Sequence, residues 1–576
     1  MPQDIYDPLE EFVNTFQPRF KDVAEKTFGE LADEARVDVE ANRETCRQIY
    51  ANEEQLASVK TTGGWWKAVC IILWIVAIGG IISIIIMHED WSEETILTIA
   101  LFIILAIAIL LIKVHPLLKS IKRESEHLSG IIKELKDKAW EQMSPLNRLY
   151  DWDIFTRMMS KTVPKLEFDP YFTTQRLADL KATYNWDDSF NSERSVIYSH
   201  SGLINGNPFV LCRTRMMVSG IKTYYGSKTI YWTETVRDAD GKTRTVQRSE
   251  TLTASVDAFY PEYPETTRLI YGNTSAPDLI FNRKKSSLAG KEKTLGFKWR
   301  LRSMRKKARN LSNADFAMMT NEEFEVAFDT SDRNNNQQFA LLFTPLAQEN
   351  MLKLLKDKKV GFGDNFDFVK RKMINTIIPD HLQELDLDMN PKHYQHFDFD
   401  KIQEEFHAIN ARYFRYIYFS FAPLLCVPMY QQIRPHHDIY GRDMQHESSF
   451  WEHEALANFW GEGHFMHSDC VTPNILKTQR KHVQDGKTTI KVHAHGYCKE
   501  ERVTYVSRWG GDGHWHNVPV YWNEYLPVTG SGYLYLKEDN EFKDNGITHR
   551  QRLEHINHIL QKTDLDLYRR HIASTV

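Results

Sequence analysis

Two long apolar stretches stand out from an otherwise mixed pattern of polar and hydrophobic positions. Residues 65–87 read WWKAVCIILWIVAIGGIISIIIM and carry one charge, Lys67, near their start, while residues 95–112 carry none. At about 1.5 Å per residue, each stretch can cross a hydrocarbon core of about 30 Å. Neither has the polar face that a core helix of a globular protein usually shows. The pattern therefore predicts two transmembrane helices that form a hairpin.

The charges around the two spans predict their orientation. The connector, residues 88–94, holds four acidic residues and no Lys or Arg. Cations lie at the other ends of the spans: Lys60, Lys67, Lys113, Lys119, Lys122 and Arg123. Because Lys and Arg remain on the cytoplasmic side, we expect a multi-pass protein of the cell membrane with both termini in the cytoplasm. The first span begins only at residue 65, so we expect no cleavable signal peptide.

Charged segments with helical periodicity flank the predicted hairpin. The apolar stripe before it is Phe28, Leu31, Ala35, Val39, Cys46 and Ile49, and the stripe after it is Leu117, Ile121, Leu128, Ile131, Leu135 and Ala139. Two arrangements would bury these stripes. The two helices can pair as a short coiled coil, or each can pack separately on a later domain.

Beyond residue 145 the pattern changes to aromatic and β-branched residues. Residues 228–237 and 243–252 alternate around an Asp-Gly turn and predict a β-hairpin. Residues 324–355 predict a strand, a polar turn, a second strand and then a helix that starts near Leu346. These elements predict an α+β domain.

The last third of the chain is rich in His, Tyr and Trp. Strand-like runs at residues 488–497, 501–509 and 517–522, with a glycine-rich turn at 510–513, predict a second β-rich module, and residues 550–572 predict a terminal helix. The fold class is therefore a membrane protein with an α-helical transmembrane hairpin and cytosolic α+β, β-rich domains. The predicted parts are an N-terminal cytosolic helical segment (1–64), the hairpin (65–113), a cytosolic helix (114–145), an α+β domain (146–380) and a C-terminal His/aromatic-rich domain (381–576).

One segment has a recognisable sequence. NEEFEVAFDTSDRNNNQQFALLFTPLAQENMLKLL, residues 321–355, resembles the signature of a bacterial family of two-helix membrane proteins whose soluble domain has no known function. The resemblance extends to the order of parts and fades after about Asp380. It implies the architecture and a bacterial origin, and it implies no catalytic residues.

The net charge of −5, from 72 Lys+Arg and 77 Asp+Glu, is unexceptional, but one segment is strongly basic. Residues 283–309 hold twelve Lys or Arg and one acid, Glu292, with apolar residues between them. On a tethered domain such a segment is drawn to the anionic inner leaflet, so we expect lipid rather than nucleic acid as its partner; a solvated surface loop is the alternative. The candidate lipid-binding residues are Arg283, Lys284, Lys285, Lys298, Trp299, Arg300, Arg302, Arg305, Lys306, Lys307 and Arg309.

A second candidate is a metal site. The six Cys have no framework spacing, which is typical of reduced thiols in the cytosol. His464, His467 and Cys470, together with His493, His495 and Cys498, could supply the four ligands of a zinc ion. The second cluster equally fits the alternation of a half-exposed strand. We expect no cofactor, with zinc as the alternative.

Catalytic signatures are missing from the sequence. No G-x-S-x-G or dinucleotide fingerprint is present. We therefore expect a non-enzymatic scaffold or sensor, tethered to the membrane, that binds a protein partner, anionic lipid or both. The alternative is a metal-dependent enzyme or metal sensor. A homo-oligomer is compatible with either.

Overall fold

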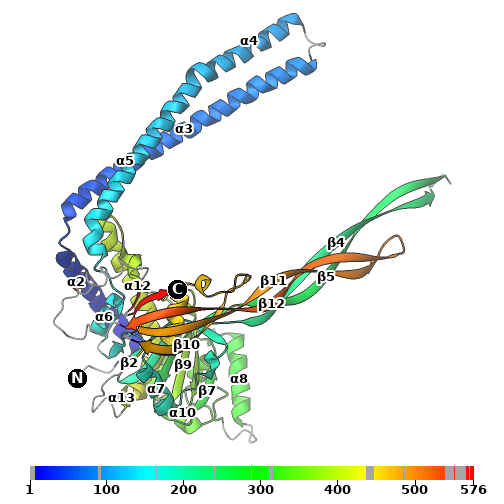
Figure 1. Cartoon of the computed structure of the whole chain (residues 1–576). Coiled ribbons are helices and arrows are strands. Elements are labelled where there is room, and N and C mark those ends of the chain that lie inside the picture. Colours follow the sequence, from blue (N-terminus) through cyan, green and yellow to red (C-terminus); the bar gives the residue numbers. More distant parts are fainter. Residues whose placement is uncertain are drawn as a thin grey trace. The chain divides into compact units, whose positions relative to one another are not determined.

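The computed structural model (Figure 1) describes residues 5, 7–87, 92–163, 165–237, 242–286, 288–309, 316–435, 447–484, 487–538, 551, 566–569 and 571–575. The chain divides into two compact units. The helical unit combines Glu25–Tyr150 with Pro391–Ile409, and the sheet unit combines Met1–Ala24, Asp151–Asn390 and Asn410–Val576. Most of the predicted 146–380 and 381–576 domains thus belongs to one unit.

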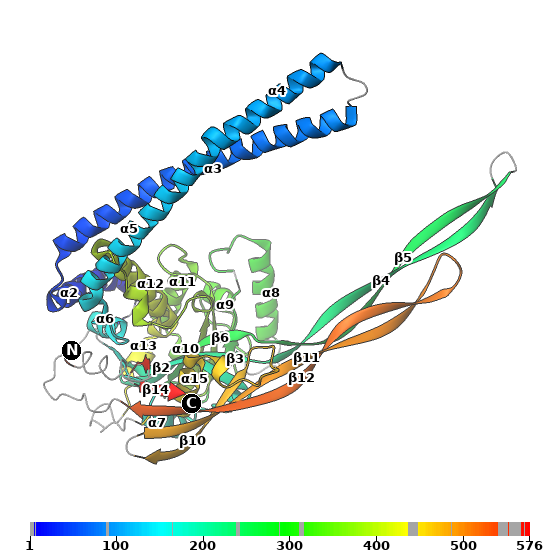
Figure 2. The same cartoon turned by 45° about the horizontal axis from the view of Figure 1, so that its top comes forward.

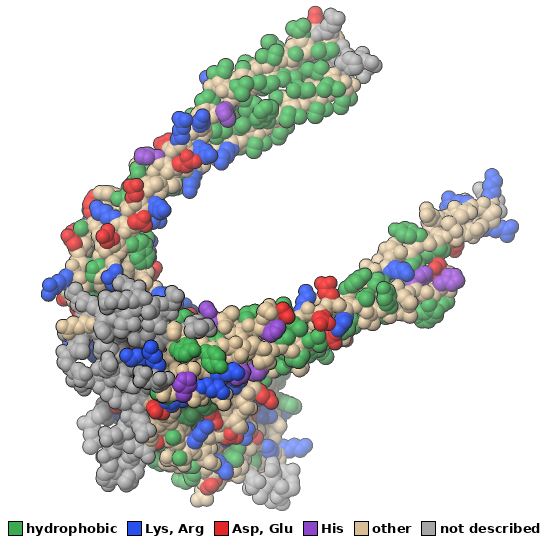
Figure 3. Space-filling view, in the orientation of Figure 1, with side chains coloured by type: hydrophobic (Ala, Val, Ile, Leu, Met, Phe, Trp, Pro, Cys, Tyr) green, Lys and Arg blue, Asp and Glu red, His purple; other side chains and the backbone are tan. Residues whose placement is uncertain are grey.

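Long helices dominate the helical unit. They are α3 (Val39–Met87), α4 (Glu93–Ile109) and α5 (His115–Asn147), with a π-helical turn, Leu110–Val114, between α4 and α5. Two helical stretches are long and apolar enough to cross a membrane. Only 6% and 17% of their most apolar windows are buried, whereas the core helix of a soluble protein is mostly buried. Figure 3 shows hydrophobic side chains covering this part of the unit. Residues 88–91 of the predicted connector lie outside the described residues.

Helices α3 and α5 lie side by side. Lys136 of α5 forms an ion pair with Glu53 of α3 at 2.6 Å. A Cβ at Gly63 would come within 2.9 Å of Ile121 Cγ2, so glycine permits this close approach. The later part of the first stripe (Val39, Cys46 and Ile49) and the second stripe therefore belong to neighbouring helices, and a coiled-coil geometry stays a prediction.

The earlier part of the first stripe packs elsewhere in the helical unit. Phe28, on α2 (Gln17–Ala35), contacts the rings of Phe399 and Phe406 on α12 (Phe399–Leu425), at 5.6 and 5.4 Å between centroids. Separate packing, the second of the two arrangements expected from the sequence, therefore holds for this part of the stripe, while the coiled coil stays a prediction for the rest.

A seven-stranded antiparallel sheet forms the core of the sheet unit, in the order β1-β2-β3-β6-β9-β8-β7. Its strands are β1 (Leu166–Phe168), β2 (Arg194–Ile204), β3 (Asn207–Met216), β6 (Glu265–Gly272), β7 (Ile280–Arg283), β8 (Phe366–Arg371) and β9 (Ile374–Pro379). Val210 and Ile270 face α7 (Thr174–Tyr184) and α15 (Phe450–Trp460). Their neighbours Phe209 and Tyr271 face the opposite way, toward Phe421 and Tyr430. Helices thus cover both faces.

Further helices of the sheet unit are α1 (Pro8–Glu11), α6 (Ile154–Thr162), α8 (Leu295–Arg309), α9 (Glu322–Phe328), α10 (Asn336–Leu342), α11 (Pro345–Lys356) and α13 (Pro428–Gln432). Helix α15 separates the first sheet from a second. Its Trp451 and Ala455 belong to the core of the seven-stranded sheet, whereas Leu456 and Ala457 pack on the second sheet.

The second sheet has the strand order β10-β11-β12-β14-β13, and β4 and β5 form a separate hairpin. The bounds are β4 (Val218–Arg237), β5 (Thr243–Glu262), β10 (Ile475–Gln484), β11 (Lys487–Trp509), β12 (Trp515–Glu538), β13 (Asp566–Tyr568) and β14 (His571–Thr575). The β11–β12 hairpin runs on past its neighbours and packs against β4 and β5 (Figures 1 and 2). We call these two paired hairpins the β-arm.

A small apolar core joins the two hairpins of the β-arm. Ile230 and Leu252 of the first hairpin pack with Val518 and Val520 of the second. A Cβ at Gly226 would collide with the carbonyl oxygen of Pro519, so glycine is needed where the two backbones approach most closely.

The structure confirms the strand predictions in these hairpins. The predicted 228–252 hairpin lies within β4 and β5, and the runs from 488 to 522 lie within β11 and β12. Residues 238–241, the Asp-Gly turn, lie outside the described residues.

The two strands predicted within residues 324–345 are wrong, because α9 and α10 occupy this stretch. Asn321 and Asn335 each cap a helix by accepting a hydrogen bond from a backbone N–H, and Asp329 ends α9 in a left-handed conformation. Helix α11 begins at Pro345, close to the predicted start. The predicted terminal helix is wrong at its C-terminal end, since Asp566–Tyr568 and His571–Thr575 are strands; residue 551 is helical, and residues 552–565 lie outside the described residues.

Candidate functional site

Helix α8 carries most of the basic segment and is fixed to the sheet unit along one side. Phe297 and Met304 are buried against Val326 of α9. Arg300, beside them, donates to both carboxylate oxygens of Asp329 at 2.9 and 2.6 Å. These contacts determine which side of the helix faces out, and Figure 2 shows α8 next to α9.

The outward side of α8 combines cations with exposed apolar side chains. We define the outward face as Leu295, Lys298, Trp299, Arg302, Lys306 and Arg309, which are three or four positions apart and exposed. Leu295 is 85% exposed and Trp299 is 70% exposed. Within the described part of the chain, no ion pair involves Arg302, Lys306 or Arg309. Together with Arg305 they line a shallow hollow of about 370 Å³.

The one acid of the basic segment does not neutralise this face. Glu292 forms an ion pair with Lys356 of α11 at 3.1 Å, and Lys356 also pairs with Glu323. Hydrogen bonds around this carboxyl lower the pKa of Glu292 to about 2, with Glu323 as the largest contributor and Lys356 as another. Glu292 therefore stays charged but is directed toward α11.

Other predicted lipid-binding residues have different roles. Arg283 is fully buried on β7, where it pairs with Asp364 and donates to the carbonyl oxygen of Phe366, so its guanidinium is not at the surface. Burial lowers the pKa of Arg283.

Three further cations of the predicted set are occupied by partners in the sheet unit. Lys285 pairs with Asp380, Arg305 pairs with Glu322, and Lys307 donates to the carbonyl oxygen of Ser331. Lys284 is exposed and, among the described residues, forms no ion pair. The set predicted from the sequence thus separates into an outward face and a group of internal contacts.

The predicted zinc ligands lie on two sides of the second sheet. Ala494 of β11 pairs with Gly530 of β12, and a Cβ at Gly530 would collide with the backbone of residues 465–467. The turn that carries His464 and His467 therefore covers the Ala494 side. His493 and His495 point to the other side, because neighbouring residues of a strand alternate.

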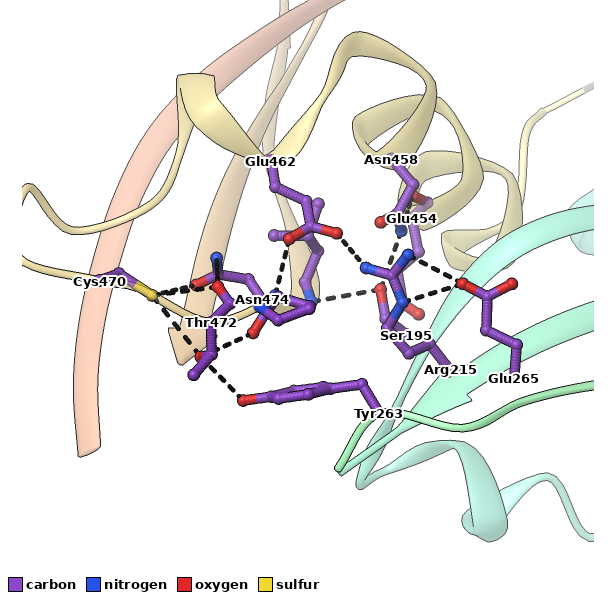
Figure 4. Close-up of polar contacts among 12 residues, drawn as sticks. Ser195, Arg215, Tyr263, Glu265, Glu454, Asn458, Glu462, Cys470, Thr472 and Asn474 are labelled. Carbon is purple, nitrogen blue, oxygen red and sulfur yellow. Dashed lines mark hydrogen bonds and ion pairs between the residues drawn. The ribbon is translucent and has the colours of Figure 1, made fainter. Parts of the chain in front are cut away.

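The hydrogen-bond partners of the Cys470 thiol are uncharged oxygen atoms and not other predicted zinc ligands. It donates to the carbonyl oxygen of Thr472 at 3.4 Å and to Oδ1 of Asn474 at 3.6 Å (Figure 4). Cys498 is half-buried. The described residues include all six predicted ligands, and among them no three His, Cys, Asp or Glu side chains form a group that could hold a metal ion.

A buried charged cluster in the sheet unit was missed by the sequence analysis. Arg569 donates to both carboxylate oxygens of Glu452 at 3.3 and 3.2 Å, and Lys477 pairs with Glu454 at 2.6 Å. Burial raises the pKa of Glu454 to about 7. The available signal was the sequence FWEHEALANFW, in which three consecutive ionisable residues interrupt an apolar helix.

A cavity of about 20 Å³ lies beside Arg569 and is also lined by Tyr198 and His200. His200 Nε2 lies 2.9 Å from the carbonyl oxygen of Asp169, so this nitrogen carries the proton, and Nδ1 accepts from the Tyr198 hydroxyl at 3.3 Å. Burial lowers the pKa of His200 to about 4. The cavity has room for about one water molecule, which is too small for an organic substrate.

Comparison with protein-family models, with curated proteins and with solved structures finds no match to the chain. The resemblance to the bacterial two-helix family therefore stays a prediction.

Proposed function

We propose that this chain is a membrane-tethered binding protein whose sheet unit contacts the anionic inner leaflet through the outward face of α8. The observation that carries the proposal is the combination, on one side of a fixed helix, of four cations without ion-pair partners among the described residues (Lys298, Arg302, Lys306 and Arg309) and two exposed apolar side chains. Interfacial helices have this composition.

The tether is the second part of the proposal. Apolar segments of α3 and α4 cross the cell membrane, and the acidic connector faces out, so both termini are cytoplasmic. A sheet unit tethered in this way stays close to the leaflet. Each cation near an anionic surface contributes about 1 kcal/mol, so Arg302, Lys306 and Arg309 together contribute about 3 kcal/mol of attraction.

Varying the lipid around the full-length protein tests whether the outward face of α8 contacts the anionic leaflet. The chain is reconstituted into vesicles of neutral or anionic lipid, with a photo-crosslinking amino acid in place of Trp299. We expect lipid adducts at this position in anionic vesicles, fewer adducts in neutral vesicles, and a decrease at high salt, which screens exposed charges. The same crosslinker in place of Tyr231, which is also 70% exposed but lies on β4, is the control position.

A charge-reversal variant tests the cations directly. Arg302→Glu, Lys306→Glu and Arg309→Glu together should abolish the adduct at position 299. The matched control reverses the exposed Lys358, Lys359 and Arg371 instead, with the same change in net charge. Equal adduct yields in neutral and anionic vesicles, or equal yields from the two triple variants, would overturn the proposal.

A further inference from the structure

The surface of the β11–β12 hairpin that faces away from β4 and β5 carries a run of aromatic residues. In the register of the two strands, Trp509 pairs with Trp515, Ser507 with Asn517, Tyr505 with Pro519 and Val503 with Tyr521. Alternate residues of a strand share one side, so these eight side chains lie on the same side of the hairpin. We call this set the aromatic face.

The aromatic face is strongly exposed although the other side of the same hairpin is buried. Tyr521 is 70% exposed, Trp515 67%, Tyr505 63% and Trp509 56%, whereas Val518 and Val520 between them are fully buried against the first hairpin. Single exposed hydrophobic residues are ordinary, but a contiguous group of this size marks an interaction surface. Figure 3 shows hydrophobic side chains along the β-arm.

The lack of charge on the aromatic face indicates which class of partner it can bind. None of its eight positions is charged. Beside the face, Arg502 pairs with Glu524 at 2.7 Å and Asp512 with His516 at 2.9 Å, while one acid, Glu501, and one base, Arg508, are exposed without an ion pair among the described residues. Nucleic acid or an anionic lipid headgroup would require cations here. A neutral surface of Trp, Tyr, Ser and Asn instead suits a protein interface, where Trp and Tyr are enriched.

A second copy of the same chain fits this surface. Two identical neutral faces can stack about a two-fold axis without bringing like charges together. The hairpin already accepts a two-stranded layer on its inner side, which shows that its twist is compatible with face-to-face stacking.

The size of the aromatic face is also adequate. With about 200 Å² for each aromatic side chain, the four exposed rings offer roughly 500 Å² per copy. A standard interface buries about 800 Å² per partner, and the four remaining positions of the face supply further area. We propose that two copies of this chain dimerise by stacking their aromatic faces, β-arm against β-arm. This goes beyond the lipid contact and does not depend on α8.

The association state of the full-length protein in detergent tests the proposal. Light scattering should give the mass of a dimer at micromolar concentration. Because a few aromatic residues carry most of the binding energy of an interface, Tyr505→Ser, Trp509→Ser and Trp515→Ser together should weaken dimerisation by at least roughly 100-fold. The matched control is Ile221→Ser, Tyr225→Ser and Tyr231→Ser, which removes equally exposed residues of β4 and should leave the dimer intact.

Cysteine crosslinking locates the interface independently of the apolar helices. Ser507 lies near the centre of the aromatic face, so Ser507→Cys should form an intermolecular disulfide, whereas Thr229→Cys, exposed on β4, should not. The background carries Cys70→Ala and Cys498→Ser, since the other four native thiols are buried. A monomeric wild-type protein, a dimer that survives the aromatic substitutions, or the absence of a crosslink at position 507 would each overturn the proposal. A lipid adduct from a photo-crosslinking amino acid in place of Trp515, in the monomer reconstituted into neutral vesicles, would assign the face to lipid instead.

Discussion

Arg333 and Glu325 form an ion pair in which neither side chain is exposed. Glu325 lies on α9 next to Val326, the residue against which α8 packs. The guanidinium donates to the two carboxylate oxygens at 3.0 and 2.7 Å, and its Nε donates to Asn336 Oδ1 at 2.8 Å. The ring of Phe339 packs against it at 4.2 Å. We predict that Arg333→Met destabilises this region far more than the loss of an exposed ion pair does.

The size of the predicted loss of stability depends on which partners Glu325 keeps after the Arg333→Met substitution. Its carboxylate still accepts a hydrogen bond from the backbone N–H of Met319 at 2.7 Å, but it loses the only cation that pairs with it among the described residues. Removing one partner of a buried pair costs about 3–5 kcal/mol, because the remaining charge is buried without compensation. The predicted cost is a large part of the total stability of a typical domain, about 5–15 kcal/mol.

Hydrogen exchange measured by mass spectrometry on the full-length protein reports the local opening free energy of α9 and α10. Arg333→Met should lower it by the predicted amount. The double variant with Glu325→Gln should recover about 1–3 kcal/mol, since it also removes the stranded charge. Arg305→Met is the control, because its pair with Glu322 is exposed and should contribute little. A loss below about 1 kcal/mol, or a double variant as unstable as Arg333→Met, would refute this reasoning.

Three further predictions concern other parts of the sheet unit. Gly226→Ala should destabilise the β-arm by about 1–3 kcal/mol, measured as faster amide exchange in β4 and β12. Gly130→Ala, where an added Cβ meets no other atom, should leave this exchange unchanged. Equal exchange in the two variants would contradict the close approach of Gly226 to Pro519. Burial lowers the pKa of His200 to about 4 from an ordinary 6.5, so the folded state binds a proton at this imidazole less readily than the unfolded state does. The free energy of unfolding should therefore fall by about 3 kcal/mol as the pH drops from 6.5 to 4. His200→Gln should remove this part of the pH dependence of denaturant unfolding, and an unchanged pH profile would show that the group is not neutral in the fold. Chelation should leave the melting temperature unchanged, and a stoichiometric zinc ion lost on Cys470→Ser would show that the His and Cys clusters do bind metal.

The features that sequence reasoning located best depend on local pattern alone. The two apolar stretches and the long hairpins are visible in windows of ten to twenty residues, because hydropathy and strand alternation need no knowledge of distant contacts. The failure at residues 324–328 has a local cause as well. Residues 324–328 are all buried, including the one charged residue among them, Glu325, so this part of α9 has no exposed polar face that would distinguish a helix from a strand.

The candidate site was recognised as a basic segment, but the cations of its outward face could not be separated from those that have partners inside the sheet unit. Arg283, Arg300 and Lys285 look equivalent to Arg302 and Lys306 in the sequence. Their acidic partners are Asp364, Asp329 and Asp380, which lie 29 to 95 residues away. Such pairs arise only when the chain has folded, so composition overestimates the number of cations available to a ligand.

The continuity of α3 has a mechanical consequence. Its 49 residues form one helix of about 74 Å, in which the apolar segment and the charged segment share an unbroken backbone. At the charged end, Asn42 donates to the carbonyl oxygen of Phe397 at 2.9 Å and accepts from the backbone N–H of Phe399 at 3.0 Å. A rotation or tilt imposed on the apolar end therefore reaches these hydrogen bonds as a displacement of the whole rod, since no loop in between can absorb it.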